Sequence, residues 1–76
     1  MPSAMNSVTR VASSVIAEVR YDEEGALLEV LFHNGRVYRY LDVPPDEYES
    51  LIHAESVGKY FNQEIRTRYE VLKQED

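Results

Sequence analysis

The chain has 76 residues, no cysteine, six tyrosines, two phenylalanines and a formal net charge of −6. This length suits one domain with one hydrophobic core, and without cysteine neither a disulfide nor a thiolate metal site can reinforce that core. The negative charge disfavours nonspecific attraction to nucleic acid or anionic membrane, and no segment has the apolar run of a signal peptide or a membrane span, so we expect a cytoplasmic protein without membrane association.

The N-terminal half predicts a tail and two strands. Residues 1–13 are rich in Ser, Ala and Asn without a sustained period, which predicts a flexible N-terminal tail. From Ser14, apolar and polar side chains alternate, and we expect a first strand that ends at Asp22 before a turn. Ala26 to Phe32 is almost wholly apolar, as is typical of a central strand.

An Asn-Gly turn after Phe32 predicts a hairpin. A two-residue loop would place Arg39 opposite Val30, among apolar side chains. A three-residue loop, His33-Asn34-Gly35 with Gly35 left-handed, instead pairs Arg39 with Glu29, Val30 with Tyr38, and Leu28 with Tyr40. Burial of an unpaired guanidinium is costly, whereas an exposed Glu–Arg pair is not. We therefore predict the three-residue loop.

Two short amphipathic helices are expected after this hairpin. Pro45 suits the first turn of a helix, and the apolar stripe Tyr48, Leu51 and Ile52 predicts that this helix reaches Ala54. Ser56 is the expected N-cap of the second helix, whose buried face would consist of Val57, Tyr60 or Phe61, and Ile65.

Beyond Arg66 two alternatives are open: Tyr69 and Leu72 continue the helical stripe, whereas Thr67 and Val71 suit an extended segment. The predicted fold is therefore α+β. It comprises a three-stranded antiparallel meander followed by two short C-terminal helices packed on one sheet face, in a domain at 14–69 with a C-terminal tail at 70–76.

Several short motifs follow one another along the chain: Tyr21-Asp22, Leu28-x-Val30-x-Phe32, Tyr38-x-Tyr40, Val43-Pro44 and Ser56-x-Gly58-x-Tyr60-Phe61-Asn62. In these motifs the chain resembles the KTSC domain, a module named for its occurrence at the C-terminus of some lysyl-tRNA synthetases and also found as small free-standing bacterial proteins. The resemblance spans roughly Val11 to Tyr69. The link to a tRNA synthetase implies an RNA-binding, tRNA-associated role and no more specific activity.

The Tyr38-x-Tyr40 motif has two interpretations. Aromatic side chains on strands form stacking platforms for unpaired bases in several RNA-binding folds. In the register above, however, both rings share a sheet face with Leu28, Val30 and Phe32, which favours a structural role in the core.

The second helix carries the best RNA or phosphate site that the sequence offers. Gly58 lies in its first turn, where backbone N–H groups lack partners. Lys59, Asn62 and Arg66 recur at i, i+3 and i+7 on one polar stripe, with Arg68 nearby and Tyr60 as a possible stacking ring. The alternative is that Gly58 permits close helix packing and the basic residues form a solvated face.

The opposite sheet face carries four apolar side chains, Leu27, Leu31, Val37 and Leu41. Either another element covers them, or they form a patch for a protein partner or a second copy. The sequence leaves the oligomeric state open. RNA and protein are thus the two candidate partners.

Catalytic and metal chemistry find no support in the residue pattern. His33 lies in a tight turn and His53 near a helix end, with no cysteine and no carboxylate spacing that assembles an acid, a base and a nucleophile. We expect no enzyme activity, no cofactor and no metal site.

Overall fold

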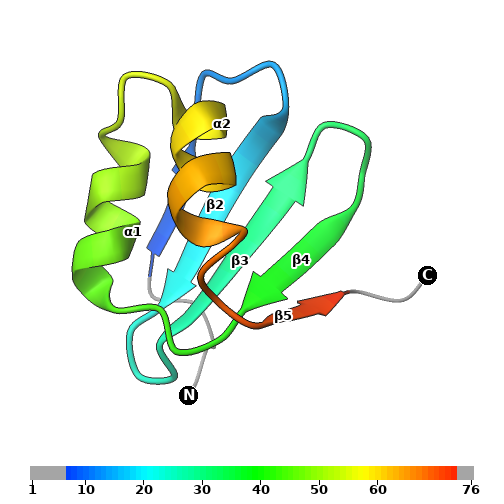
Figure 1. Cartoon of the computed structure of the whole chain (residues 1–76). Helices are drawn as coiled ribbons and strands as arrows, with labels where there is room; N and C mark the ends of the chain where they lie inside the picture. The colour runs from blue at the N-terminus through cyan, green and yellow to red at the C-terminus, as the bar shows by residue number, and fades with distance from the viewer. Residues whose placement is uncertain (1–6, 74–76) are drawn as a thin grey trace.

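Five antiparallel strands in the order β1-β2-β3-β4-β5 form one sheet in the computed structural model, which describes residues 7–73 (Figure 1). The strands are β1 (Ser7–Arg10), β2 (Ile16–Asp22), β3 (Leu27–Phe32), β4 (Val37–Tyr40) and β5 (Val71–Lys73). Helix α1 (Pro45–Ile52) and helix α2 (Val57–Tyr60) with its π-helical continuation η1 (Phe61–Ile65) lie on the same sheet face. The α+β class is therefore confirmed.

The meander is longer than the predicted three strands. Residues 7–10 and 71–73, which the sequence analysis assigned to the two tails, form the edge strands β1 and β5. Strands this short carry too little periodicity to be recognised, and pairing with β2 and β4 holds them in place. The rest of the predicted tails, residues 1–6 and 74–76, lies outside the described residues.

The hairpin register is confirmed: Val30 pairs with Tyr38, Leu28 with Tyr40 and Glu29 with Arg39. Phe32 N–H donates to the Arg36 carbonyl at 2.9 Å, and Gly35 N–H donates to the Phe32 carbonyl at 2.9 Å, which closes a three-residue loop. Gly35 has φ +92°, a conformation that glycine adopts without a Cβ clash.

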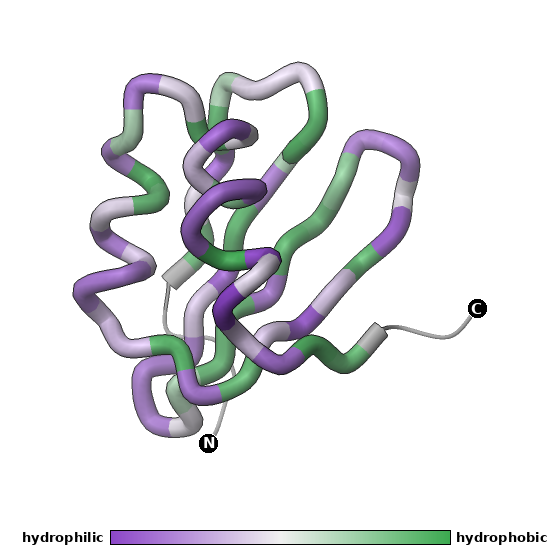
Figure 2. The backbone as a smooth tube through the Cα atoms, in the orientation of Figure 1, coloured by the Kyte–Doolittle hydropathy of each residue, from purple (hydrophilic) through white to green (hydrophobic). Residues whose placement is uncertain are grey.

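The hydrophobic core lies between the sheet and the helices, and Figure 2 shows the hydrophobic residues along both. Fully buried side chains come from both layers: Ile16, Val19, Leu28 and Val30 from the sheet, and Leu51 and Ile65 from the helices. The rings of Tyr21 and Tyr48 stack with centroids 5.0 Å apart, and Tyr48 shares a 2.7 Å hydrogen bond with the Thr9 hydroxyl. This bond joins α1 to the edge strand β1.

The helix boundaries agree with the expected start signals. Pro45 is the first residue of α1, and the Ser56 hydroxyl accepts a hydrogen bond from Lys59 N–H at 3.3 Å as the N-cap of α2. In η1, Arg66 N–H donates to the Phe61 carbonyl at 2.9 Å, an i to i+5 bond. After Arg66 the chain leaves the helix and becomes extended at Val71, so the second of the two alternatives is correct.

Candidate functional site

An open groove of about 340 Å³ lies between the β3–β4 hairpin and η1, and four aromatic rings line it: Phe32, Tyr38, Tyr40 and Phe61. Phe61 meets Phe32 and Tyr40 edge to face, with both centroid distances 5.5 Å. Tyr38 meets Phe32 in the same manner at 5.3 Å. Because the rings brace one another, the aromatic wall of the groove is held in place before any ligand binds.

Two amides and two guanidinium groups form the polar rim of this groove: Asn34 and Arg36 from the hairpin, and Asn62 and Arg66 from η1 and its C-cap. The Asn34 Oδ1 atom accepts from Arg36 N–H at 2.9 Å. The Asn62 Oδ1 atom accepts from Arg66 Nη1 at 3.4 Å. The rim therefore combines hydrogen-bond donors with positive charge.

The groove lining is unusual for a protein with 14 acidic residues. No Asp or Glu among residues 7–73 lines it. Within the same residues, neither Arg36 nor Arg66 has a carboxylate within 4.0 Å, whereas Arg10, Arg20, Arg39 and Arg68 each have at least one. The two guanidinium groups that face the groove are thus left without an internal counter-charge.

Tyr40 lies at the base of this groove and is 2% exposed. Burial raises the pKa of the Tyr40 hydroxyl to about 12, although the nearby Arg66 guanidinium acts in the opposite direction. The phenol is therefore neutral at physiological pH. Tyr38 is half-buried. The Tyr40 ring is part of the core, the Tyr38 ring packs against it, and both rings also line the groove.

The residues predicted as an RNA or phosphate site divide between two sides of the helix. Asn62 and Arg66 line the groove. Gly58, Lys59 and Asn62 line an adjoining hollow beside residues 12–15 and Glu55. A Cβ at Gly58 would lie 3.4 Å from the Ser13 hydroxyl. A side chain at this position would make an ordinary contact with Ser13 in the β1–β2 connection and not with α1, so the packing here does not depend on glycine.

Tyr60 on α2 and Arg68 in the turn after η1 do not line the groove and have carboxylate partners of their own. The Tyr60 hydroxyl donates to Glu47 Oε2 at 2.6 Å, and the Arg68 Nη1 donates to Glu64 Oε1 at 2.8 Å. These two side chains have partners that direct them away from the groove. The predicted set therefore reduces to the stripe of Lys59, Asn62 and Arg66.

The sequence analysis missed Phe32, Asn34, Arg36 and Phe61 as groove residues. One signal was present for Arg36, because positions 36, 38 and 40 alternate on one face of a strand. Once Tyr38 and Tyr40 were placed on the helix-facing side, Arg36 belonged beside them. Phe61 became part of the groove only through the packing of η1 on the sheet.

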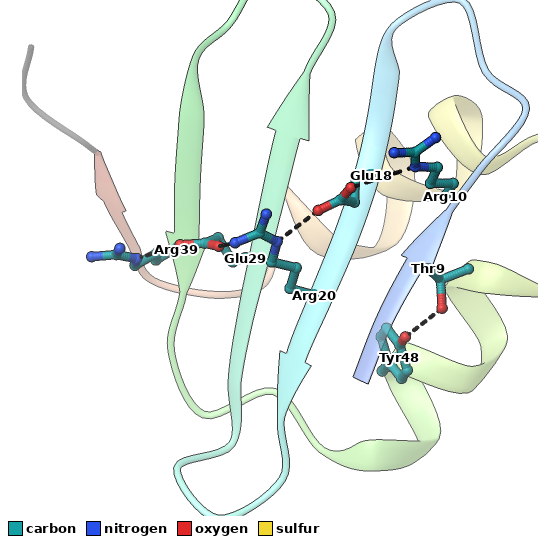
Figure 3. A network of polar contacts seen from close by, with 7 residues as sticks. All are labelled: Thr9, Arg10, Glu18, Arg20, Glu29, Arg39 and Tyr48. Carbon is teal, nitrogen blue, oxygen red and sulfur yellow. Dashed lines mark hydrogen bonds and ion pairs between the residues drawn. The ribbon is translucent and has the colours of Figure 1, made fainter. Parts of the chain in front are cut away.

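The outer sheet face, which neither α1 nor α2 covers, carries a ladder of charged side chains across four strands (Figures 1 and 3). Glu18 lies 2.6 Å from Arg20, and Glu29 lies 3.6 Å from Arg20 and 2.8 Å from Arg39. The predicted apolar patch of Leu27, Leu31, Val37 and Leu41 flanks this ladder and is only partly exposed. Long charged side chains cover part of its surface.

The histidines take part in local contacts with the backbone. His33 Nε2 is hydrogen-bonded to the Ser13 carbonyl at 2.9 Å, and His53 Nδ1 to the Glu49 carbonyl at 3.0 Å. Residues 7–73 contain no cluster of three His, Cys, Asp or Glu side chains suited to a metal ion. In the same part of the chain no helix is long and apolar enough to cross a membrane.

Comparisons with known proteins converge on one small domain. The KTSC domain family matches residues 12–69. An uncharacterized protein of Stutzerimonas stutzeri is 40% identical over 57 residues, which cover 75% of this chain and 80% of that protein. A protein of Tsukamurella paurometabola is 34% identical over 62 residues, covering 82% and 92% of the two chains. The crystal structure of a KTSC domain protein from Yersinia pestis superposes with a TM-score of 0.82 at 30% identity and covers 91% of this chain and 97% of that one.

Proposed function

This chain belongs to the KTSC domain family, and from the geometry of its groove we propose that it is a non-catalytic RNA-binding accessory module. The proposal places an unpaired base of the RNA against the half-buried rings of Phe32 and Tyr38, since the Tyr40 and Phe61 rings are buried. It places the adjacent phosphate at the guanidinium groups of the rim.

One observation carries the proposal. In a chain of net charge −6, an aromatic groove is lined by no Asp or Glu among residues 7–73, and its two arginines, Arg36 and Arg66, form no ion pair there. Unpaired guanidinium groups are the preferred partners of phosphate in proteins. Aromatic side chains next to them provide the stacking surfaces on which proteins hold unpaired bases. Such a local exception to the charge of the whole protein supports a polyanionic ligand.

The shape of the site favours single-stranded RNA over a duplex. The rings lie in a groove between a hairpin turn and a helix, so a base must leave its stack to reach them. Stacking on one such ring contributes about 1–3 kcal/mol per base. Paired and stacked bases are not available for this contact.

A path for the neighbouring nucleotide follows the helix. The groove and the hollow at Gly58 and Lys59 share Val15 and Asn62, so the two adjoin. Within residues 7–73, Lys59 has no carboxylate within 4.0 Å. The stripe of Arg66, Asn62 and Lys59 thus offers a phosphate contact at each end.

An NMR titration with a short single-stranded RNA at low salt tests this proposal. We expect amide shifts at Phe32–Tyr40 and Lys59–Arg66, and weaker binding by Arg66→Ala. The matched control is Arg68→Ala, which removes an arginine two residues away whose carboxylate partner is Glu64. RNA-induced shifts absent from both segments would contradict the proposal, as would equal losses in the two variants.

A protein-interaction or dimerising role is the second candidate, favoured by the outer sheet face that the helices leave uncovered (Figure 1). Its contacts would come from Leu27, Leu31, Val37 and Leu41. The charged ladder argues against direct face-to-face pairing of two copies, because its order Arg-Glu-Arg-Glu-Arg is the same from either end. A two-fold axis through Arg20 would therefore oppose like charges.

A further inference from the structure

We infer that the groove selects an unpaired guanosine from the RNA, with Arg36 reading the base and Arg66 contacting its phosphate. The inference rests on the proposed function and deepens it, since it names the nucleotide. The choice of nucleotide depends on which hydrogen-bonding atoms of the rim already have partners within the protein.

The two side chains on the hairpin side of the rim, Asn34 and Arg36, present mainly donors. The Asn34 Oδ1 atom accepts from Arg36 N–H at 2.9 Å, which leaves the two N–H donors of the Asn34 amide for a ligand. The Arg36 side chain is exposed and has no ion pair or hydrogen bond with the described residues. Its guanidinium fork, with five donors, is therefore fully available.

Guanine is the base whose edge matches such a fork. Its O6 and N7 atoms are adjacent acceptors that one guanidinium binds in a bidentate manner. The corresponding edge of adenine carries an N6 amino donor, and cytosine carries an N4 amino donor. Either donor would face the Arg36 and Asn34 donors. Uracil presents a single carbonyl oxygen, O4, at that position, so it provides only half of the contact.

The helix side of the groove suits the phosphate. The Arg66 guanidinium lies at the rim, where it makes a long, 3.4 Å hydrogen bond to Asn62 Oδ1. A positioned guanidinium that retains free donors suits a phosphate oxygen. Because Arg36 and Arg66 come from opposite walls, one nucleotide contacts both. The volume of about 340 Å³ lies at the small end of ligand sites, as expected for one nucleotide.

The test measures the affinity of the full chain for labelled five-nucleotide RNAs that differ only in their central base, UUGUU, UUAUU, UUCUU and UUUUU, by fluorescence anisotropy. We expect UUGUU to bind about tenfold more tightly than UUAUU, the discrimination typical of one bidentate contact. Replacing the central guanine with 7-deazaguanine, which lacks the N7 acceptor, is expected to remove most of this preference.

Arg36→Lys provides the matched variant, because it retains the charge and removes the planar fork. We expect it to bind UUUUU as the native chain does and to lose the preference for UUGUU. Equal binding of the four RNAs, with Arg66→Ala still weakening them all, would overturn the guanosine inference and leave the RNA-binding proposal standing. Failure of all four to bind at low salt would overturn both.

Discussion

Arg39 Nε donates to Glu29 Oε2 at 2.8 Å across β3 and β4, on the sheet face opposite α1 and α2 (Figure 3). Glu29 is 8% exposed even so, because the side chains of neighbouring strands surround it. Its other oxygen, Oε1, lies 3.6 Å from Arg20 on β2. One carboxylate therefore links three adjacent strands.

Removing this carboxylate should destabilise the sheet more than removing either arginine. Glu29→Ala leaves two guanidinium groups side by side, and we expect a loss of roughly 1–3 kcal/mol in the free energy of unfolding. In Arg39→Ala the carboxylate retains Arg20, so a loss below about 1 kcal/mol is expected. Urea unfolding of both variants measures the difference. Equal losses would show that Glu29 does not act as the central link.

The same pair shows how far the sequence predicts this fold. Chemical matching of Glu29 with Arg39 identified the hairpin register, because the alternative loop would have placed an arginine among apolar side chains. No comparable constraint existed for β1 and β5. Their residues gain strand structure from pairing with β2 and β4, and the four residues of β1 carry too few alternations to indicate it.

Gly35 is expected to be the glycine most sensitive to substitution. At φ +92°, an alanine would hold a strained backbone, and we expect Gly35→Ala to cost about 1–2 kcal/mol of stability. Gly35→Asn should cost less, because asparagine tolerates this region better. Thermal unfolding followed by circular dichroism compares the two. If Gly35→Asn destabilised the protein as much as Gly35→Ala, the loss of stability would not come from the backbone conformation at Gly35.

Gly58→Ala provides the contrast within the same chain. Gly58 has no positive φ, and its new methyl group would lie 3.4 Å from the Ser13 hydroxyl. Helix propensity favours alanine by about 0.8–1.0 kcal/mol, so we expect a change in stability close to zero or a small gain. Thermal unfolding provides the measurement. A loss of stability as large as that of Gly35→Ala would mean that the Ser13 side chain cannot move away from the new methyl group.

Alkaline pH should destabilise the protein through Tyr40. The ordinary tyrosine pKa is 10.0, and burial raises the pKa of Tyr40 to about 12. The unfolded chain therefore loses this proton first, and the stabilisation present below pH 10 is lost as the pH rises through about 12. A shift of this size corresponds to about 2–3 kcal/mol. We expect Tyr40→Phe to flatten the fall in melting temperature over this range, and an unchanged slope would contradict the assignment to Tyr40.

The salt dependence of RNA binding separates the roles of the two groove arginines. A phosphate contact on single-stranded RNA contributes about −0.7 to the slope of log K against log salt concentration. We expect Arg66→Ala to reduce the magnitude of this slope by about 0.7, whereas Arg36→Ala leaves it nearly unchanged because Arg36 contacts the base. Affinities measured between low and moderate salt provide the slopes. The reverse result would exchange the roles of the two residues.

The groove itself was only partly accessible from the sequence. The stripe of Lys59, Asn62 and Arg66 followed from helical spacing, and two of its members do line the groove. The other wall comes from a hairpin turn far away in the chain, so only tertiary packing brings it opposite Arg66. The same packing pairs Tyr60 with Glu47, which helical periodicity alone does not indicate.

Glu47 on α1 should act as the anchor for two tyrosines from later parts of the chain. Tyr60 donates to Glu47 Oε2 at 2.6 Å and Tyr69 to Glu47 Oε1 at 3.2 Å. We expect Glu47→Ala to lose about 1–2 kcal/mol of stability, because both hydroxyl groups lose a charged acceptor.

The hydrogen bond to Glu47 is also the main reason that the pKa of Tyr60 is raised. After burial, Glu47 also contributes to the raised pKa of Tyr69, so an ultraviolet titration should show two tyrosines that ionise at lower pH in the variant. Glu49→Ala is the matched control, because this exposed carboxylate lies on the same helix, and its ion-pair partner among residues 7–73 is His53, 3.6 Å away. If both variants had the same stability and the same tyrosine titration, Glu47 would not hold the C-terminal segment against α1.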